Sequence, residues 1–451
     1  MSAMKLRKVI CGLLLVALSM APLRVVVAAE RITGGPMPGY AAMRAAQIWL
    51  QASGGPAQVD IEYWPAGKPN EARVSRAQAL TADDDFTAKL AIGGLEPGTT
   101  YEYRVRLDGV PQPASNSLRF HTQPLWQWRT DPPAFTVALG SCAYINEAAY
   151  DRPGTPYGGG YEIFDAIAAM QPTMMLWLGD NIYLREADYD SPYGMNYRYR
   201  HVRSFAPLQR LLQGTHHVAT WDDHDFGPDN TNGSFVLKGA ALELFQRYWA
   251  NPSYGLPQVP GVFTVISYGD VDFFLLDDRY YRHSDDAHDS AAKTMLGTAQ
   301  VQWLQDALLA SDATFKFIAN GSQLLFGQPG TESWVRFPEE RQGFLDWLAR
   351  TKVKGVMFLS GDRHMTRLYR QERTGAYPLY ELTCSPLASG ARDPSKEIAS
   401  PLAVDGTQVG ERNFCTLGFS GPRKQRVLIL RVHSTQGNLL WERKIQAREL
   451  Q

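Results

Sequence analysis

The chain has 451 residues, of which 44% are hydrophobic, and a formal net charge of −1 from 45 basic and 46 acidic side chains. This length is enough for a large hydrophobic core and predicts two domains. No run of basic residues occurs, which argues against a nucleic-acid coat protein, against sequence-specific nucleic-acid binding and against a helix lying on a membrane surface.

Residues 1–29 have the three parts of a secretory signal. A basic start precedes an apolar core over 9–20, and small residues at 27–29 form a cleavage site. The apolar core is too short to span a membrane, and no later segment is long and apolar enough for a transmembrane anchor. We therefore expect export to the periplasm or the cell exterior, with a retained anchor as the alternative.

Residues 30–122 are predicted to form an all-β domain. The segments 46–50 and 59–64 alternate apolar and polar residues, as half-buried strands do. Around Tyr101, a Pro-Gly turn leads into a strand, which resembles the tyrosine corner of immunoglobulin and fibronectin-III sandwiches. No cluster of ionisable groups suited to catalysis occurs here, so we expect a structural or positioning domain. A linker rich in Trp, Gln and Pro follows over 123–133.

Residues 134–451 alternate between strand and helix patterns, which predicts an α/β sandwich. The expected strands are 135–139, 174–178, 219–221, 315–318, 356–359 and 377–383, with hairpins over 262–276 and 427–444. The expected helices are 161–170, 197–212, 235–249, 298–309 and 339–350. In such folds ligands bind outside the C-terminal ends of strands.

Charged side chains follow three of these strands. Residues 222–225 read Asp-Asp-His-Asp, while Asp180 and Asp362 each follow a glycine just past an apolar strand. Adjacent carboxylates repel one another and are costly to desolvate together, so a cation is expected against them. Taken alone, Asp180 could instead cap the next turn, and His224 could be a structural histidine.

The ends of four strands supply the candidate metal ligands, which are Cys142, Asp180, Tyr183, Asp223, His224, Asp362 and His364. Carboxylate oxygens suit Ca²⁺, Mg²⁺ or Fe³⁺, whereas thiolate and imidazole suit iron or zinc. A phenol binds a metal only when a strong cation removes its proton, so Tyr183 indicates trivalent iron, unless it is a plain core tyrosine. Asp180 would be well placed to bridge two metals, the arrangement that recurs in phosphoester hydrolysis.

Three cysteines follow the signal, which predicts one disulfide and one thiol with another role. Cys384 and Cys415 are the expected pair. Cys142 is either a buried inert thiol or a metal thiolate, and its neighbours favour the thiolate. Four further histidines are expected in loops and not as ligands: His216, His217, His283 and His288.

Five motifs occur in a fixed order and together carry a family resemblance. They are GSCAY (140–144), GDNIY (179–183), WDDHD (221–225), LDDRYYR (276–282) and SGDRH (360–364). The chain resembles the PhoD-type alkaline phosphatases and phosphodiesterases, a branch of the calcineurin-like metallophosphoesterases. That resemblance implies a metallophosphatase-like αββα sandwich preceded by an immunoglobulin-like domain.

The resemblance also implies a dinuclear metal site. Fe(III) would be held by Cys142, Asp180 and Tyr183, with His364 as a further ligand. Ca(II) would share Asp180 and take Asp223 and Asp362; Asp222 and Asp223 could exchange roles, and zinc or manganese could replace either ion.

Two residues would then contact the substrate. His224 would contact the phosphate or protonate the leaving group, and Arg279 would bind the phosphate unless it pairs with Asp277 or Asp278. Asn320 is a weaker candidate for the second metal or the phosphate. Asp278 stands where the family leads us to expect a neutral residue.

The sequence thus predicts an exported metal-dependent hydrolase that uses a metal-bound hydroxide on a phosphomonoester, a nucleotide-type diester or a phospholipid. A different class of function is a non-catalytic calcium-dependent binding module that keeps the fold. A hydrolase of carboxylic esters would need a Gly-x-Ser-x-Gly motif, and the catalytic region has none. The oligomeric state is not predicted.

Overall fold

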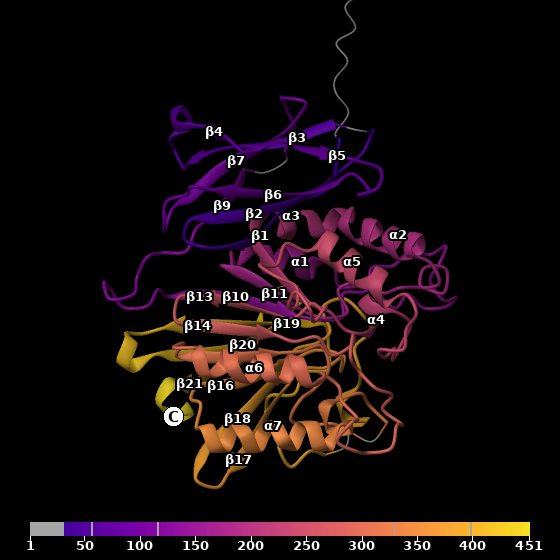
Figure 1. Ribbon diagram of the computed structural model, residues 1–451, viewed down its shortest axis with the longest axis vertical. Helices are drawn as coiled ribbons and strands as arrows, with labels where there is room; N and C mark the ends of the chain where they lie inside the picture. The colour runs from indigo at the N-terminus through magenta and orange to yellow at the C-terminus, as the bar shows by residue number, and fades with distance from the viewer. Residues whose placement is uncertain (1–30, 56, 115–116, 329, 397–398) are drawn as a thin grey trace, which may run out of the picture.

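We describe a computed structural model that covers residues 31–451, except 56, 115–116, 329 and 397–398. The predicted secretory signal lies outside the described residues. Figure 1 shows a β-rich N-terminal part above a layered region of sheets and helices. No helix in the described part of the chain combines the length and the apolar character that crossing a bilayer requires.

Two sheets form the N-terminal part. One has the order β1-β2-β6, from Ile32–Ala41, Ala45–Ala52 and Thr87–Gly93. The other joins β3 (Ala57–Pro65), β4 (Arg73–Val74), β5 (Gln78–Leu80), β7 (Thr100–Leu107), β8 (Val110–Pro111) and β9 (Leu118–His121). Alternating side chains such as Ile48 and Leu50 are fully buried between them. The Tyr101 hydroxyl accepts the backbone N–H of Glu96 at 2.9 Å, the contact that the sequence predicted.

The first central sheet combines parallel and antiparallel strands. Its order is β12 (His216–Thr220), β11 (Met174–Leu178), β10 (Phe135–Gly140), β19 (Asn413–Ser420), β20 (Val427–Ser434) and β21 (Leu439–Gln446). The strands β10, β11 and β12 are mutually parallel, whereas β19 to β21 run antiparallel. All residues of β11 and β12 are buried, as expected for strands covered on both faces.

The second central sheet packs against the first. Its order is β13 (Thr264–Tyr268), β14 (Val271–Leu275), β15 (Phe315–Ala319), β16 (Val356–Ser360), β18 (Ala376–Thr383) and β17 (Arg367–Arg373). The strands β14, β15, β16 and β18 are parallel. Rings from both sheets meet in the shared core, where Phe419 stacks on Phe135 at 4.7 Å and lies 5.8 Å from Phe317 between ring centroids.

Helices cover the outer faces of this pair of sheets. Those beside the first sheet are α1 (Glu162–Ala169), α2 (Pro192–Arg203), α3 (Ala206–Gly214) and α5 (Lys238–Tyr248). Those beside the second are α6 (Thr298–Ala310) and α7 (Pro338–Thr351). Figure 1 shows the first group between the N-terminal sheets and the central sheets. The result is a mixed α/β fold in which the parallel strands of the two central sheets have their C-terminal ends at one edge.

The structure corrects some predicted elements. The helix expected over 197–212 is two helices, because α3 begins at Ala206 with a proline in its first turn. Proline lacks the N–H that a continuous helix needs and favours a helix start. The strands β17 and β19 and the short helix α4 (Asp223–Phe226) were not predicted. His216 and His217 are buried in β12, so their expected place in a loop was wrong.

A disulfide joins the two central sheets. Cys384 follows β18 in the second sheet and Cys415 lies within β19 of the first. The predicted pairing of these two cysteines is confirmed, and Cys142 is the free, buried thiol.

Candidate metal centre

The candidate ligands lie just beyond the C-terminal ends of parallel strands from both central sheets. Cys142 and Asp180 each stand two residues past the ends of β10 and β11 in the first sheet. Asp362 stands two residues past β16 in the second sheet, and Asp223 begins α4 after β12. Parallel strands direct their C-terminal ends to one edge, so the fold gathers side chains that are far apart in the sequence.

The backbone at these positions adopts an unusual conformation. Cys142, Asp180, Asp362 and His364 all have positive φ angles, of 63°, 50°, 63° and 55°. Residues with side chains adopt this left-handed region rarely, and such residues cluster at functional sites. Gly179, at φ 85°, precedes Asp180 because a Cβ there would lie 2.6 Å from the Cβ of Asp222.

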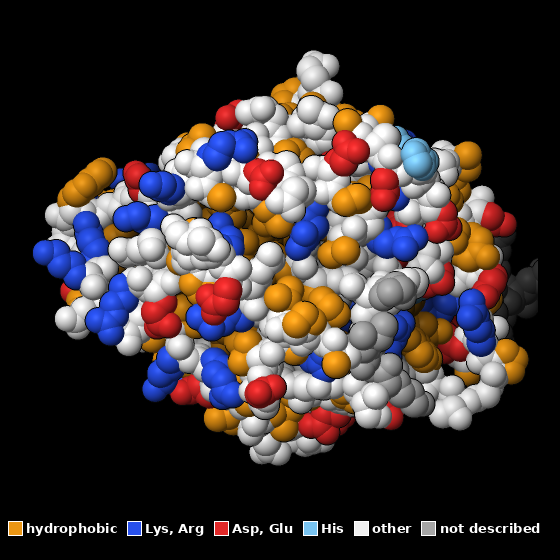
Figure 2. All heavy atoms as spheres, turned by 90° about the horizontal axis from the view of Figure 1, so that it is seen from below, with side chains coloured by type: hydrophobic (Ala, Val, Ile, Leu, Met, Phe, Trp, Pro, Cys, Tyr) orange, Lys and Arg blue, Asp and Glu red, His pale blue; other side chains and the backbone are white. Residues whose placement is uncertain are grey.

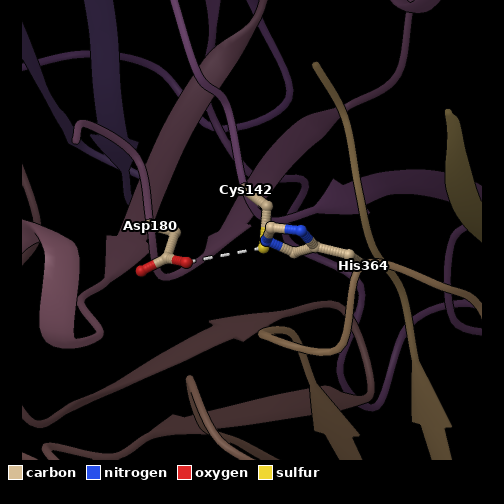
Figure 3. Close-up of side chains that lie close together, drawn as sticks. All are labelled: Cys142, Asp180 and His364. Carbon is tan, nitrogen blue, oxygen red and sulfur yellow. Dashed lines mark hydrogen bonds between the residues drawn. The ribbon is translucent and has the colours of Figure 1, made fainter. Parts of the chain in front are cut away.

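A first group of donors surrounds the Cys142 thiol. One donor atom each from Cys142, Asp180 and His364 lie within 4.8 Å of one another, and Figure 3 shows these side chains converging. The Tyr183 hydroxyl lies 3.0 Å from Asp180 Oδ2 and 3.2 Å from His364 Nε2. Thiol, carboxyl, phenol and imidazole therefore face one another in the interior.

A second group shares one member with the first. Donor atoms of Asp180, Asp223 and His224 also lie within 4.8 Å of one another. Asp180 Oδ2 faces Cys142 and Tyr183, while Oδ1 accepts the backbone N–H of His224 at 3.4 Å. Asp362 belongs to neither group in the described residues, although its charge acts on Asp180 and Cys142.

Burial controls the protonation of the first group. Desolvation, added to by the charges of Asp223 and Cys142, raises the pKa of Asp180 well above its usual range. Burial likewise raises the pKa of Cys142 to about 12, raises the pKa of Tyr183 well above its usual range, and lowers the pKa of His364 to about 3. Each shift disfavours the charged form. A bound cation would reverse this preference for the three acids.

Asp223 behaves differently from Asp180. Burial acts to raise the pKa of its carboxyl, but His224 and Arg279 outweigh that effect and lower it to about 2. Asp223 Oδ2 also accepts the backbone N–H of Asn230 at 2.7 Å. The pKa values of the neighbouring carboxyls of Asp180 and Asp223 are therefore shifted in opposite directions.

Arg279 lies among carboxylates. Its side chain is 0% exposed, and it donates to Asp222 Oδ1 from Nε at 2.7 Å and to Glu332 Oε2 at 2.7 Å. Of the alternative partners that the sequence offered, Asp278 also forms an ion pair with Arg279, its Oδ1 3.7 Å from Nε, and Asp277 accepts the Arg279 backbone N–H at 3.0 Å. A direct contact between Arg279 and a phosphate would require one of these ion pairs to open.

Other carboxylates at the strand ends fix loops. Asp225 accepts the backbone N–H groups of Asn181 and Asp222 at 3.1 Å. Asp277 accepts from the Trp221 indole at 2.8 Å. Asn320 donates to Asp278 Oδ2 at 2.9 Å, which gives this expected candidate a carboxylate partner.

Sequence reasoning missed several residues of the centre. Glu332 comes from a long loop and joins Asp222 and Asp223 in a third group of donors. Tyr157 places its hydroxyl 2.9 Å from His364 Nδ1, and the Ser385 hydroxyl lies 3.0 Å from the Cys142 sulfur. Glu332 and Tyr157 do not follow a predicted apolar strand, so no local pattern marked them. Ser385 lies just past the predicted strand 377–383, but no charged motif accompanies it.

The residues present have the side-chain types that hold metal ions. Among the described residues, the buried atoms near the strand ends that lack a hydrogen-bond partner include Asn181 Oδ1, Asp222 Oδ2, His224 Nδ1, Asp278 Oδ1 and Asn320 Oδ1. Buried polar atoms are normally satisfied, so such a concentration indicates an additional bound group. The first group offers thiol, imidazole and carboxyl donors, and the group around Asp223 offers mainly carboxylates, all of which are metal-ligand types.

Comparisons with known proteins agree with this geometry. The family described as PhoD-like phosphatase matches residues 137–417, and a domain of unknown function matches residues 29–124. Alkaline phosphatase D of Bacillus subtilis (strain 168) is 25% identical over an alignment of 385 residues, and the match covers 69% of this chain and 63% of that protein. This chain therefore spans less than two thirds of that relative's length.

Solved structures share the fold. A structure of PhoD superposes with a TM-score of 0.74 at 19% identity, covering 93% of this chain and 92% of that one. The purple acid phosphatase PPD1 from yellow lupin (Lupinus luteus) seeds has a TM-score of 0.68 at 13% identity, with 91% and 74% covered. At these identities the matches establish a common fold.

Proposed function

Since this chain belongs to the PhoD-like phosphatase family, we propose that it is an exported, metal-dependent hydrolase of phosphoric esters that acts at the strand ends around Asp180. The observation that carries the proposal is the position of Asp180, which belongs to both donor groups; its Oδ2 accepts from the Tyr183 hydroxyl and its Oδ1 accepts the backbone N–H of His224. A carboxylate in this position is what a site for two adjacent metals requires.

The ligands proposed from the sequence fall into two sets. Fe(III) would be held by Cys142, Asp180, Tyr183 and His364, and Ca(II) by Asp180, Asp223 and Asp362, with zinc or manganese as the alternative ions. Asp223 is the better ligand of the adjacent pair, because Arg279 holds Asp222. When bound, two such ions neutralise charge on phosphoryl oxygens and lower the pKa of a coordinated water.

His224 is the proposed proton donor to the departing alcohol. Its ring packs on that of Tyr183 with centroids 4.2 Å apart, and its side chain is 21% exposed. Nε2 lies 3.4 Å from Asp229 Oδ1 and 4.0 Å from Asp223 Oδ2. The ring therefore lies beside two carboxylates, and its partial exposure leaves it accessible to a substrate.

Arg279 acts in our proposal as a positioning residue. Its guanidinium holds Asp222 and Glu332 beside Asp223, so it determines where the negative charge of the second donor group lies. The resemblance assigns it to phosphate binding, which its complete burial does not favour.

The substrate class and the location are also proposals. Phosphomonoesters, nucleotide-type diesters and phospholipids all fit a two-metal centre. Export is supported by the signal-like residues 1–29 and by the Cys384–Cys415 disulfide, since disulfides persist in oxidising compartments. For the N-terminal sheets we propose an immunoglobulin- or fibronectin-III-like sandwich, supported by the Tyr101 corner contact.

Replacing Asp180 tests the proposal. Asp180→Asn should remove both metals and lower kcat/KM on p-nitrophenyl phosphate and bis(p-nitrophenyl) phosphate by at least about 10³-fold, because one carboxylate serves both donor groups. Elemental analysis of protein purified without chelators gives the metal content beside the rate.

Asp190→Asn is the matched control, because Asp190 is an exposed carboxylate shortly after the same strand. It should retain metal content and activity. An Asp180→Asn protein with the wild-type metal content and rate would contradict the proposal. If Asp180→Asn loses its metal but the wild-type protein hydrolyses no phosphoester, the result would instead favour a binding module.

A further inference from the structure

A second surface of the molecule lies at the opposite edge of the central sheets from the metal centre. A cavity of about 910 Å³ opens where the second sheet's strands begin, and Lys316 at the start of β15 and Lys354 just before β16 line it. The metal centre follows the C-terminal ends of the same strands. Five residues of strand, roughly 16 Å, therefore separate the two.

Basic side chains dominate this cavity. The charged side chains that line it are Asp312, Lys316, Lys354, Arg423, Lys424, Arg426 and Arg448, and Gln451 at the end of the chain also lines it. Two of these cations have partners within the protein. Arg426 pairs with Asp270 at 2.8 Å, and Lys316 is largely buried and donates to the Ala313 carbonyl at 2.6 Å. The remaining four come from three separate segments.

Three of these cations have no ion pair within the described residues. Lys354, Lys424 and Arg448 are exposed, and Asp312 is the acidic side chain in the lining. The whole chain carries a formal charge of −1, so this concentration of positive charge is a local asymmetry. In Figure 2, several blue side chains lie close together toward the left, the side on which Figure 1 places β21 and the C-terminus.

An exposed tryptophan adjoins the cations. A shallower hollow is lined by Trp128, Arg129 and Asp131 together with Arg423 and Lys424, so it continues directly from the cavity. Trp128 is 87% exposed, and its φ of 56° places it at the tip of a turn in which the N–H groups of Arg129 and Thr130 contact the Trp126 carbonyl at 3.0 Å.

The turn is attached to the basic segment. The Arg423 backbone N–H donates to Asp131 Oδ1 at 3.0 Å, its guanidinium donates to the Thr130 carbonyl at 3.2 Å, and the same guanidinium lies 5.3 Å over the Trp126 ring. Trp128 and the cations thus form one surface. We call Trp128, Lys354, Arg423, Lys424 and Arg448 the basic edge.

We propose that the basic edge docks this protein on an anionic lipid surface, with Trp128 entering the headgroup region. Exposed lysine and arginine are attracted to anionic headgroups, and tryptophan favours the membrane–water interface. Cations on three separate segments match an extended array of charges better than one small anion. A soluble acidic polymer would use the cations but would gain less from an exposed indole.

The proposed orientation leaves the metal centre facing away from the lipid, because the two surfaces lie at opposite strand ends. Docking would therefore concentrate the protein at a surface without closing its reactive site. The inference does not depend on the proposed chemistry, since none of the basic-edge residues belongs to the donor groups.

Co-sedimentation of the full-length protein with vesicles tests the docking. Vesicles of 30% phosphatidylglycerol in phosphatidylcholine are compared with pure phosphatidylcholine at 50 mM NaCl. The wild type should bind the anionic vesicles only. The triple variant Lys354→Gln, Lys424→Gln, Arg448→Gln should bind them roughly 100-fold more weakly, at roughly fivefold for each cation. Binding should also fall steeply at 1 M salt.

The control triple Lys68→Gln, Arg76→Gln, Arg44→Gln removes three exposed cations from the connections between strands of the N-terminal part. Its affinity for the anionic vesicles should lie within threefold of that of the wild type. Trp128→Ser should weaken vesicle binding at least threefold and leave binding to polyphosphate unchanged. Thermal unfolding and hydrolysis of p-nitrophenyl phosphate verify that every variant is folded.

Three outcomes would overturn the proposal. The first is no binding of the wild type to anionic vesicles at 50 mM NaCl. The second is an equal loss in the two triple variants, which would indicate an effect of net charge alone. The third is tight polyphosphate binding combined with no effect of Trp128→Ser on vesicles, which would assign the basic edge to an acidic polymer.

Discussion

Tyr157 supports the first donor group from outside it. Its hydroxyl lies 2.9 Å from His364 Nδ1, and its ring meets that of Tyr144, which in turn packs on Tyr183. A ligating imidazole commonly donates its second N–H to such a partner, which fixes the ring and the tautomer. The contact leaves His364 Nε2 directed at Tyr183 and the interior.

Tyr157→Phe should therefore weaken metal binding about 10- to 100-fold with the fold retained. Competition with a chelator measures the affinity, and the visible absorption of the metal-loaded protein reports the ligand environment. Tyr150→Phe removes the hydroxyl of a comparably exposed tyrosine in the same segment and should change neither property. Equal affinities in the two variants would show that Tyr157 only packs beside the site.

Arg279 gives a second prediction at this scale. Arg279→Met leaves the buried carboxylates of Asp222 and Glu332 without their cation, so the free energy of unfolding should fall by about 3–5 kcal/mol. Urea unfolding measures it. Arg104→Met breaks an exposed pair with Glu62 and should cost about 1 kcal/mol or less. A higher KM with unchanged stability would instead establish the direct phosphate contact.

The strand β12 shows how an element sets the properties of a side chain. It lies at the edge of the first central sheet and contacts β1 of the N-terminal part. There His216 Nδ1 lies 2.7 Å from the Gly39 carbonyl, while Nε2 accepts the backbone N–H of His121 at 3.1 Å. The ring is therefore neutral, with its proton on Nδ1, and it links the two parts of the molecule.

This arrangement predicts acid sensitivity. Burial lowers the pKa of His216 to about 3, so its contribution to stability is complete above the unfolded pKa of about 6.5 and is lost as the pH falls toward 3. Between pH 7 and pH 5 that loss amounts to about 2 kcal/mol. His216→Gln should reduce the pH dependence of urea unfolding by this amount, whereas His288→Gln, at an exposed position, should not. Identical pH slopes in both variants would contradict the assignment.

The regular elements were mostly predictable, since their signals are local. The strand at 174–178 and the helix at 298–309 are confirmed almost to the residue, because an apolar run and a 3.6-residue period specify them. The strand β19 was missed because its residues, including Gly418, give no alternation and it pairs with β10, which lies far away in the sequence. Long-range pairing overrides weak local preference.

At the scale of the whole molecule, the Cys384–Cys415 disulfide cross-links the two central sheets. A closed loop of this length, with a sequence separation of 31, stabilises the folded state by about 3–4 kcal/mol through the entropy of the unfolded chain. The double variant Cys384→Ser, Cys415→Ser should lose that amount in urea unfolding. A reducing agent should destabilise the wild type and leave the double variant unchanged; an equal response of both would contradict the pairing.

The sequence by itself determined the mixed α/β class, the positions of most strands and the family, because these depend on local periodicity and on short charged motifs at strand ends. Only the tertiary structure decided which side chains meet. It paired Arg279 with Glu332, placed Tyr157 against His364, buried His216 and assembled the basic edge from separate segments. These contacts join residues 50 to more than 200 positions apart, and such proximity follows from strand order and loop path, which no local pattern encodes.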